Sequence, residues 1–284
     1  MLINTLVALL SLALASYEDM RIREIPDLLS FSMIGIGSFL AIVNSISMNS
    51  FQPIINAFFG VLAGIIIGFL LYFSGQWGGG DTKVLMGMGA LMGLNINLLF
   101  NTIPPLIMFF INIFLVGALL GLIYVIYLAI LNKNKFKKSF KDIRTTKANK
   151  MIRKTYLILI PILLIILFLL PINILLRLVF ILFVVLIYFL YQLSMIIKAV
   201  EKSCMIKKIP LSKLTEGDWI TGKIKLKNNK IFASEKTGIS AKDIALLKKN
   251  KIKFVNVKYG MPFLPSFFVA YILTIILGNW FLLF

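Results

Sequence analysis

The sequence predicts an all-α polytopic membrane protein with about eight transmembrane helices and a small cytoplasmic α+β insertion before the last helix. Of its 284 residues, 60% are hydrophobic and 14% are charged, and the mean hydropathy is +0.95. A soluble domain is typically about 45–50% apolar and ~25% charged. The apolar residues gather in long runs, and a helix of ~20 such residues crosses a bilayer core of ~30 Å. An ordinary soluble domain, a disordered chain and a disulfide scaffold are therefore excluded.

Eight apolar runs are predicted to be spans. They cover roughly residues 2–17, 28–47, 53–74, 83–100, 104–131, 155–172, 174–197 and 262–284. The first run lacks the basic residues that precede the apolar part of a secretory signal peptide, so we interpret it as a retained helix. Pro171-Ile172-Asn173 separates the sixth and seventh runs, because about 43 residues are too many for one crossing.

The charges predict the orientation. The chain has 30 Lys and Arg, 11 Asp and Glu and no His, for a net charge of +19. If the N-terminus lies outside, nearly all of the basic residues fall in the internal segments 18–27, 75–82, 132–154 and 198–261, as the positive-inside rule requires. We therefore expect a multi-pass protein of the plasma membrane whose basic segments face anionic lipid of the inner leaflet, and not a nucleic-acid-binding protein.

The chain divides into four predicted parts. They are a membrane core (1–131), a basic cytoplasmic loop with two peripheral spans (132–197), a small cytoplasmic domain (198–261) and a final span (262–284). Gly60, Gly64 and Gly68 lie four residues apart, which lets helices approach closely in lipid. Residues 122–216 contain no Gly. Within 210–258, alternation at 219–226, a turn before 230–234, a capping box from Ser240 to Asp243 and an apolar run at 252–257 predict a ββαβ unit.

Two aspartates are predicted to reach the same membrane face from different helices. Asp19 follows the first span, and Asp81 opens the fourth after three glycines. When two such carboxyl groups share a proton, the ionised one can activate a water while the protonated one polarises a carbonyl. This chemistry needs no metal or cofactor and no His, and the lone Cys204 offers no redox alternative. A simple capping turn at Asp81 and a local ion pair between Asp19 and Arg23 are the structural alternatives.

The pattern around these aspartates resembles that of a known family. Gly78-x-Gly80-Asp81 is the GxGD motif of membrane aspartyl proteases. Asp19 with Arg23, Ile25 and Pro26 looks like the first-aspartate loop of type IV prepilin peptidases, including archaeal preflagellin peptidases. Further resemblance lies in Lys83 and in the Gly-x-Pro-Phe-x-Pro element formed by Gly260, Pro262, Phe263 and Pro265.

The resemblance implies an aspartic endopeptidase that removes the short basic leader, or class III signal peptide, of prepilin or preflagellin (archaellin) precursors. Asp19 and Asp81 would be catalytic, supported by Gly78, Gly80, Lys83, Pro26, Pro262, Phe263 and Pro265. The Cys-rich N-terminal domain of the large bacterial enzymes is absent, so we expect no methyltransferase activity. Asp27 stands where many members have Asn, and the sixth and seventh spans are extra relative to six-helix archaeal members.

Acidic residues close to Asp19 are candidates for binding the leader. Glu18, Glu24 and Asp27 cluster there in a chain short of acids, and they suit the Lys and Arg of a leader. The alternative is local pairing with Arg21 and Arg23.

Three other functions stay open. One is a presenilin-like or signal-peptide-peptidase-like enzyme that cuts inside the bilayer, although Asp19 lies at the interface. Another is a transporter that uses Asp19 and Asp81 as ion ligands, although the predicted spans lack further deep acids. The third is a structural scaffold.

Overall fold

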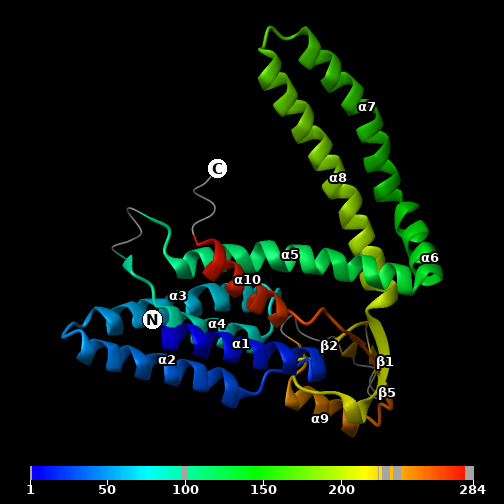
Figure 1. The fold of residues 1–284 in the computed structure, drawn as a ribbon. Coiled ribbons are helices and arrows are strands. Elements are labelled where there is room, and N and C mark those ends of the chain that lie inside the picture. Colours follow the sequence, from blue (N-terminus) through cyan, green and yellow to red (C-terminus); the bar gives the residue numbers. More distant parts are fainter. Residues whose placement is uncertain (1, 97–101, 223, 226–230, 233–237, 279–284) are drawn as a thin grey trace. The chain divides into compact units, whose positions relative to one another are not determined.

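The computed structural model describes residues 2–96, 102–222, 224–225, 231–232 and 238–278, and most of these are helical (Figure 1). The helices are α1 (Leu2–Ile22), α2 (Asp27–Ser47), α3 (Gln52–Phe73), α4 (Gly79–Met92), α5 (Pro105–Leu131), α6 (Lys133–Arg144), α7 (Lys147–Leu169), α8 (Ile174–Cys204), α9 (Ala241–Lys249) and α10 (Leu264–Leu277). The short strands are β1 (Ile206–Pro210), β2 (Trp219–Ile220), β3 (Ile224–Lys225), β4 (Ile231–Phe232) and β5 (Phe254–Lys258), with a 3₁₀ turn at Leu211–Lys213.

Six of these helices are long and apolar enough to cross a membrane, which confirms an all-α polytopic membrane protein. They are α1, α2, α3, α5, α7 and α8. The predicted spans 83–100 and 262–284 correspond to α4 and α10, which have 14 residues each and a length of only about 21 Å. The fourth predicted span is too long, because Gly93 adopts φ 66° and ends α4. Residues 97–100 and 279–284 of these two spans lie outside the described residues.

Helix α6 was not expected, since residues 132–154 were predicted to be a basic loop. Its apolar residues Phe136, Phe140 and Ile143 recur at helical spacing, and the two phenylalanine rings stack with centroids 5.7 Å apart. Phe136 packs against a buried cluster that includes Val200 and Met205. The sequence analysis predicted no helix within this connection, because the lysines obscure the apolar stripe between them.

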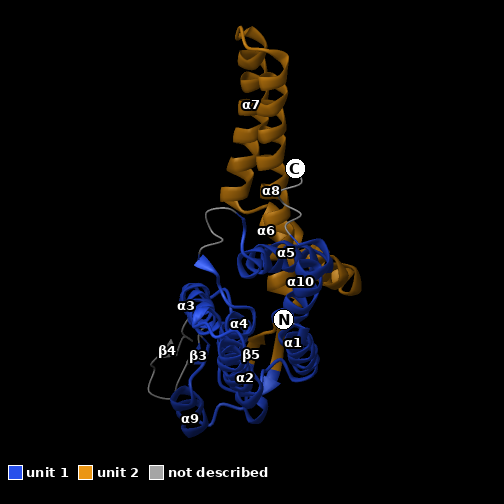
Figure 2. Cartoon of the chain, turned by 60° about the vertical axis from the view of Figure 1, so that its left-hand side comes forward, with its two compact units in different colours: residues 1–123, 209–255, 260–284 blue, residues 124–208, 256–259 orange. Residues whose placement is uncertain are grey.

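The chain forms two compact units (Figure 2). One contains residues 1–123, 209–255 and 260–284, and the other contains 124–208 and 256–259. In the first unit α3 packs on α4, α2 packs on α4, and α1 packs on α10. In the second unit α6 packs on α8, and α7 and α8 form a long helical hairpin (Figures 1 and 2).

Glycine lets α3 approach α4 at backbone distance, as the four-residue spacing predicts. A Cβ on Gly60 would overlap the carbonyl oxygen of Gly89, and one on Gly64 would lie 2.9 Å from the carbonyl oxygen of Leu85. One turn closer to the start of α4, the Thr82 hydroxyl donates a hydrogen bond to the Gly68 carbonyl at 3.2 Å. The close contact fixes the position of the first turn of α4, where Asp81 lies.

The small α+β segment broadly follows the predicted ββαβ order. β1, β5 and β2 form one sheet in that order, and β3 pairs antiparallel with β4, with Ile224 opposite Phe232. The capping box of α9 is confirmed: Asp243 N–H donates to Ser240 Oγ, and Ser240 N–H donates to Asp243 Oδ2. β1 was missed, and the strand predicted over 219–226 is interrupted at Gly222, whose φ is 89°. The predicted turn at 228–229 and residues 233–234 of the second strand lie outside the described residues.

Removing most of the α7–α8 hairpin should leave the first unit folded. Residues 155–190 expose most of their apolar side chains within the described chain. Deleting a pair of spans also keeps α10 on its original side of the membrane. A variant with a short polar linker in place of 155–190 should therefore have the melting temperature of the intact protein within a few degrees, measured in detergent by intrinsic fluorescence. Loss of the cooperative transition would show that the hairpin supports the rest of the fold.

Candidate active site

Asp19 lies in the last turn of α1 and is buried, with 7% of its surface exposed. Its Oδ2 accepts a hydrogen bond of 2.9 Å from the backbone N–H of Leu264, the first residue of α10. The first four N–H groups of a helix have no partner within that helix, and the helix N-terminus favours negative charge. The Ser16 hydroxyl, one turn earlier on α1, donates to the Leu264 carbonyl at 3.0 Å. The end of α1 is thus attached to the start of α10 by two hydrogen bonds.

Arg23 makes a second connection between these elements. It has φ 59°, and its N–H donates to the Asp19 carbonyl at 3.0 Å just beyond the end of α1. Its guanidinium donates to the Gly260 carbonyl at 2.7 Å. The segment before α10 is therefore bound at Gly260 and at Leu264 to the residues that flank Asp19. This segment contains the Gly-x-Pro-Phe-x-Pro element, whose Pro265 lies in the first turn of α10.

Asp81 is the third residue of α4, and its carboxylate turns back to the start of its own helix. Oδ2 accepts a hydrogen bond of 3.0 Å from the backbone N–H of Gly78. Asp81 lies outside the six candidate spans. Burial raises the pKa of Asp81, the negative charge of Asp19 raises it further, and the Gly78 N–H opposes the increase. The two carboxylates are thus close enough to influence each other.

The two loops that carry the aspartates are in contact through Gly80 and Ile25. A Cβ on Gly80 would lie 2.6 Å from Cδ1 of Ile25, so a larger residue would have to displace this side chain. Pro26, the next residue, is the N-cap of α2. At Gly78 an added Cβ would make only ordinary contact with Asp81, at 3.4 Å. The glycine whose size matters most for the contact between the loops is therefore Gly80.

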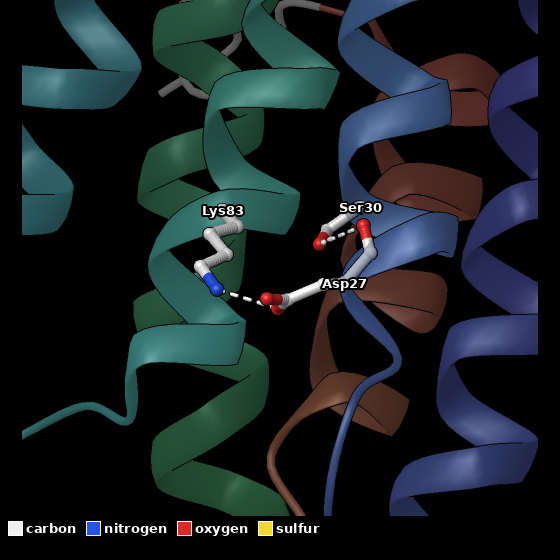
Figure 3. Close-up of polar contacts among 3 residues, drawn as sticks. All are labelled: Asp27, Ser30 and Lys83. Atoms are coloured by element: carbon white, nitrogen blue, oxygen red, sulfur yellow. Dashed lines mark hydrogen bonds and ion pairs between the residues drawn. The ribbon is translucent and has the colours of Figure 1, made fainter.

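Lys83, near the start of α4, and Asp27, the first residue of α2, form an ion pair (Figure 3). The Ser30 hydroxyl donates to the Asp27 backbone carbonyl at 3.2 Å, and the Lys83 ammonium lies 5.3 Å from the ring centroid of Phe31. The carboxylate of Asp27, which was expected to contact substrate, is thus paired with Lys83 of the same chain. Glu18 is half-buried and Glu24 is exposed. In the described part of the chain neither has an ion-pair partner, so the alternative of pairing with Arg21 and Arg23 is not observed.

An aromatic cluster connects the Pro-Phe element to the glycine-rich loop. Phe263 packs on Trp77 with ring centroids 5.4 Å apart, and Trp77 also contacts Phe267 at 5.3 Å. On its other side Phe263 fills the space beside Gly117, where a Cβ would lie 2.7 Å from the ring. Trp77 directly precedes Gly78, and Pro262 directly precedes Phe263. The cluster therefore links the segment that binds Asp19 with the loop that bears Asp81.

Sequence reasoning missed Ser16 and Trp77. Ser16 lies three residues before Asp19, which is one helical turn, and Trp77 is adjacent to the glycine run. Proximity to the motifs was the only available signal, because neither residue belongs to a spacing pattern. Within the described ranges no group of three or more His, Cys, Asp or Glu side chains could hold a metal ion.

Comparisons with known proteins find relatives for part of this chain. Residues 6–126 match the family model described as the type IV leader peptidase family. This part of the chain, which contains both Asp19 and Asp81, is similar to that family. Preflagellin peptidase of Methanococcus voltae is 34% identical over 128 residues, which are 43% of this chain and 54% of the relative.

Two further relatives match over a shorter stretch. Preflagellin peptidase of Methanococcus maripaludis is 36% identical over 91 residues, or 32% of this chain and 39% of the relative. Preflagellin peptidase of Methanocaldococcus jannaschii is 33% identical over 32% of this chain and 38% of the relative. The chain thus spans about half the length, or less, of the curated relatives it matches.

Proposed function

We propose that this protein is a membrane aspartic endopeptidase that removes the short basic leader of preflagellin (archaellin) or prepilin precursors. One observation carries the proposal. The end of α1, which carries Asp19 and accepts a hydrogen bond from the start of α10, lies close enough to the start of α4 for the charge of Asp19 to influence Asp81, although the two aspartates are 62 positions apart in the numbering. The three relatives named above are preflagellin peptidases, which supports the leader as the part removed.

The two carboxyl groups have different roles in the proposed reaction. Asp81, whose pKa is raised, keeps its proton and donates a hydrogen bond to the scissile carbonyl. Asp19, hydrogen-bonded by the Leu264 N–H, is ionised and removes a proton from a water. The oxygen of this water bonds to the carbonyl carbon. The C–N bond then breaks as the proton passes to the leaving amine. The scheme uses no cofactor, and we propose no methyltransferase activity.

We further propose that cleavage takes place at the cytoplasmic face of the plasma membrane, with the N-terminus outside. Asp19 is in the last turn of α1 and Asp81 in the first turn of α4, so both lie at helix ends, where a leader outside the bilayer can reach them. The positive-inside rule favours this orientation. The exposed lysines of α6 and of the start of α7 would face anionic lipid of the inner leaflet. The division into a catalytic core (1–131), a peripheral pair of spans, a small domain and a final span remains part of this proposal.

The role of Asp81 predicts an alkaline loss of activity. Because the pKa of Asp81 is raised, the protonated form persists above the pH at which an ordinary aspartate ionises. Cleavage should decline as the pH rises through this raised pKa, since the carbonyl loses its hydrogen-bond donor. Initial rates on a precursor, measured from about pH 5 to about pH 9, give the midpoint. A rate that stays constant or rises over this range would contradict the assignment of the proton to Asp81.

The function itself is tested by incubating purified protein with preflagellin and prepilin precursors and sequencing the N-termini of the products. We expect a single cut between the basic leader and the apolar segment. Cuts within the apolar segment would instead indicate a presenilin-like enzyme. A folded protein that cleaves none of the precursors would refute the proposal.

A further inference from the structure

A cavity of about 500 Å³ lies beside the loop that follows α1. Its wall combines Glu24 of that loop with residues of the small α+β segment, among them Leu214, Glu216 and Ile244. All of these residues belong to the same compact unit. Pockets that bind ligands usually measure ~300–1,000 Å³ and combine an apolar surface with a few polar groups. The cavity has the size and the mixed lining of a binding site.

The part of the wall formed by the small segment has a defined local structure. Helix α9 presents one face to the cavity through Ala241, Ile244, Ala245 and Lys248, which lie three, four and seven positions from the first. Its start is fixed by the capping box described above. The turn that carries Glu216 is held by Asp218, whose Oδ2 accepts hydrogen bonds from the N–H and the hydroxyl of Thr215 at 3.0 and 3.2 Å. Glu216 is therefore presented from an ordered turn.

The charges of the lining favour a basic ligand. Two carboxylates, Glu24 and Glu216, and one ammonium, Lys248, line the cavity. None of the three is paired in an ion pair with another described residue. In a chain with 30 basic and 11 acidic residues, most of the surface repels cations. A site with an excess of carboxylates therefore attracts a basic peptide electrostatically.

The cavity is also close to the proposed catalytic pair along the chain. Glu24 follows Asp19 by five positions, which an extended chain covers in at most about 18 Å. A leader of about five extended residues bridges the same distance. When the scissile bond of a precursor lies at Asp19 and Asp81, the N-terminal end of its leader can therefore reach Glu24.

We propose that this cavity binds the basic leader of the precursor. Glu24 and Glu216 pair with its Lys or Arg head groups, while Leu214 and Ile244 contact the aliphatic parts of those side chains. Lys248 opposes binding and limits the number of charges that the site accepts. The small α+β segment is then the part of the protein that recognises substrate. This inference rests on the proposed function and adds the place where the leader is held.

The test measures binding of a synthetic fluorescent leader peptide without requiring cleavage. The full-length protein carries Asp81→Asn, in a zwitterionic detergent, and the probes are a peptide with three Lys and a matched peptide with three Gln. Glu216→Gln should weaken binding of the Lys peptide about twofold to fivefold, as expected for one exposed ion pair. Lys248→Gln should strengthen it by a similar factor, which a folding defect would not do. Asp142→Asn, the same loss of a carboxylate on α6 outside the cavity, is the matched control.

Three results would separate this inference from the proposed function. Opposite changes for Glu216→Gln and Lys248→Gln on the Lys peptide alone, reduced at high salt, would support it. If the unmodified protein cleaves precursors but the two variants bind both peptides as Asp142→Asn does, the cavity is not the leader site and the proposed function stands. If the unmodified protein cleaves no precursor, the proposed function fails, and this inference fails with it.

Discussion

Replacing Asp19 or Asp81 by Asn is expected to abolish precursor cleavage, with a loss in rate of about 10²–10⁴-fold or more. Asn at 19 cannot take a proton from water, and Asn at 81 does not restore the shared proton of the pair. The amide oxygen of Asn can still accept hydrogen bonds from the N–H groups of Leu264 and Gly78, which now contact the carboxylates. The fold should therefore persist. Cleavage is measured by mass spectrometry of the product, and the fold by melting temperature in detergent.

The matched control is Asp142→Asn, which removes an exposed carboxylate on α6. It should cleave at the rate of the unmodified protein. Turnover by Asp19→Asn or Asp81→Asn within tenfold of that rate would exclude the shared-proton mechanism.

The largest effect on stability is expected for Gly60→Ala. In most helices alanine in place of glycine is favourable by roughly 0.5–1 kcal/mol. Here the new methyl group would overlap the carbonyl oxygen of Gly89, which belongs to backbone and cannot rotate away. Helices α3 and α4 would have to separate, at a cost of about 1–3 kcal/mol or more. Because α4 carries Asp81 in its first turn, cleavage should fall as well.

Gly35→Ala on α2 is the matched control, since nothing lies within 4 Å of the added Cβ. Its melting temperature should equal or exceed that of the unmodified protein, while that of Gly60→Ala should be lower. Equal melting temperatures for the two variants would show that α3 and α4 separate without cost.

The fold was predictable where one strong pattern controls the structure. Long apolar runs gave α1, α2, α3, α5, α7 and α8, and the glycine spacing indicated the close packing of α3 on α4. The end of α4 was not predictable from hydropathy, because the apolar run continues beyond Gly93 while the backbone turns there with φ 66°. Helix α6 was not predicted because its low hydropathy is typical of a loop. Six basic residues outnumber the few apolar side chains that form its stripe.

Within the site, the sequence predicted the two aspartates and the loops that bear them, and their catalytic role remains a proposal. It could not predict which group binds Asp19. The donor is the backbone N–H of Leu264. Almost every residue has such a group, so residue identity does not indicate which one will bind the carboxylate. The engagement of Asp27 by Lys83 was also hidden, since the partners are 56 positions apart. The contribution of Glu216 to the cavity depends on the fold of the α+β segment, which periodicity alone places only roughly.

The hydrogen bond between Asp19 and Leu264 joins residues 245 positions apart. During synthesis α1 emerges before α4, and the residues from Gly260 onward emerge after both. Until then the proposed site has Asp19 without its backbone donor and Arg23 without the Gly260 carbonyl. The proposed site is therefore complete only once α10 has docked on the end of α1. If the proposed function holds, a chain that has not yet made α10 lacks part of its catalytic site, so the order of synthesis delays cleavage until that helix is in place.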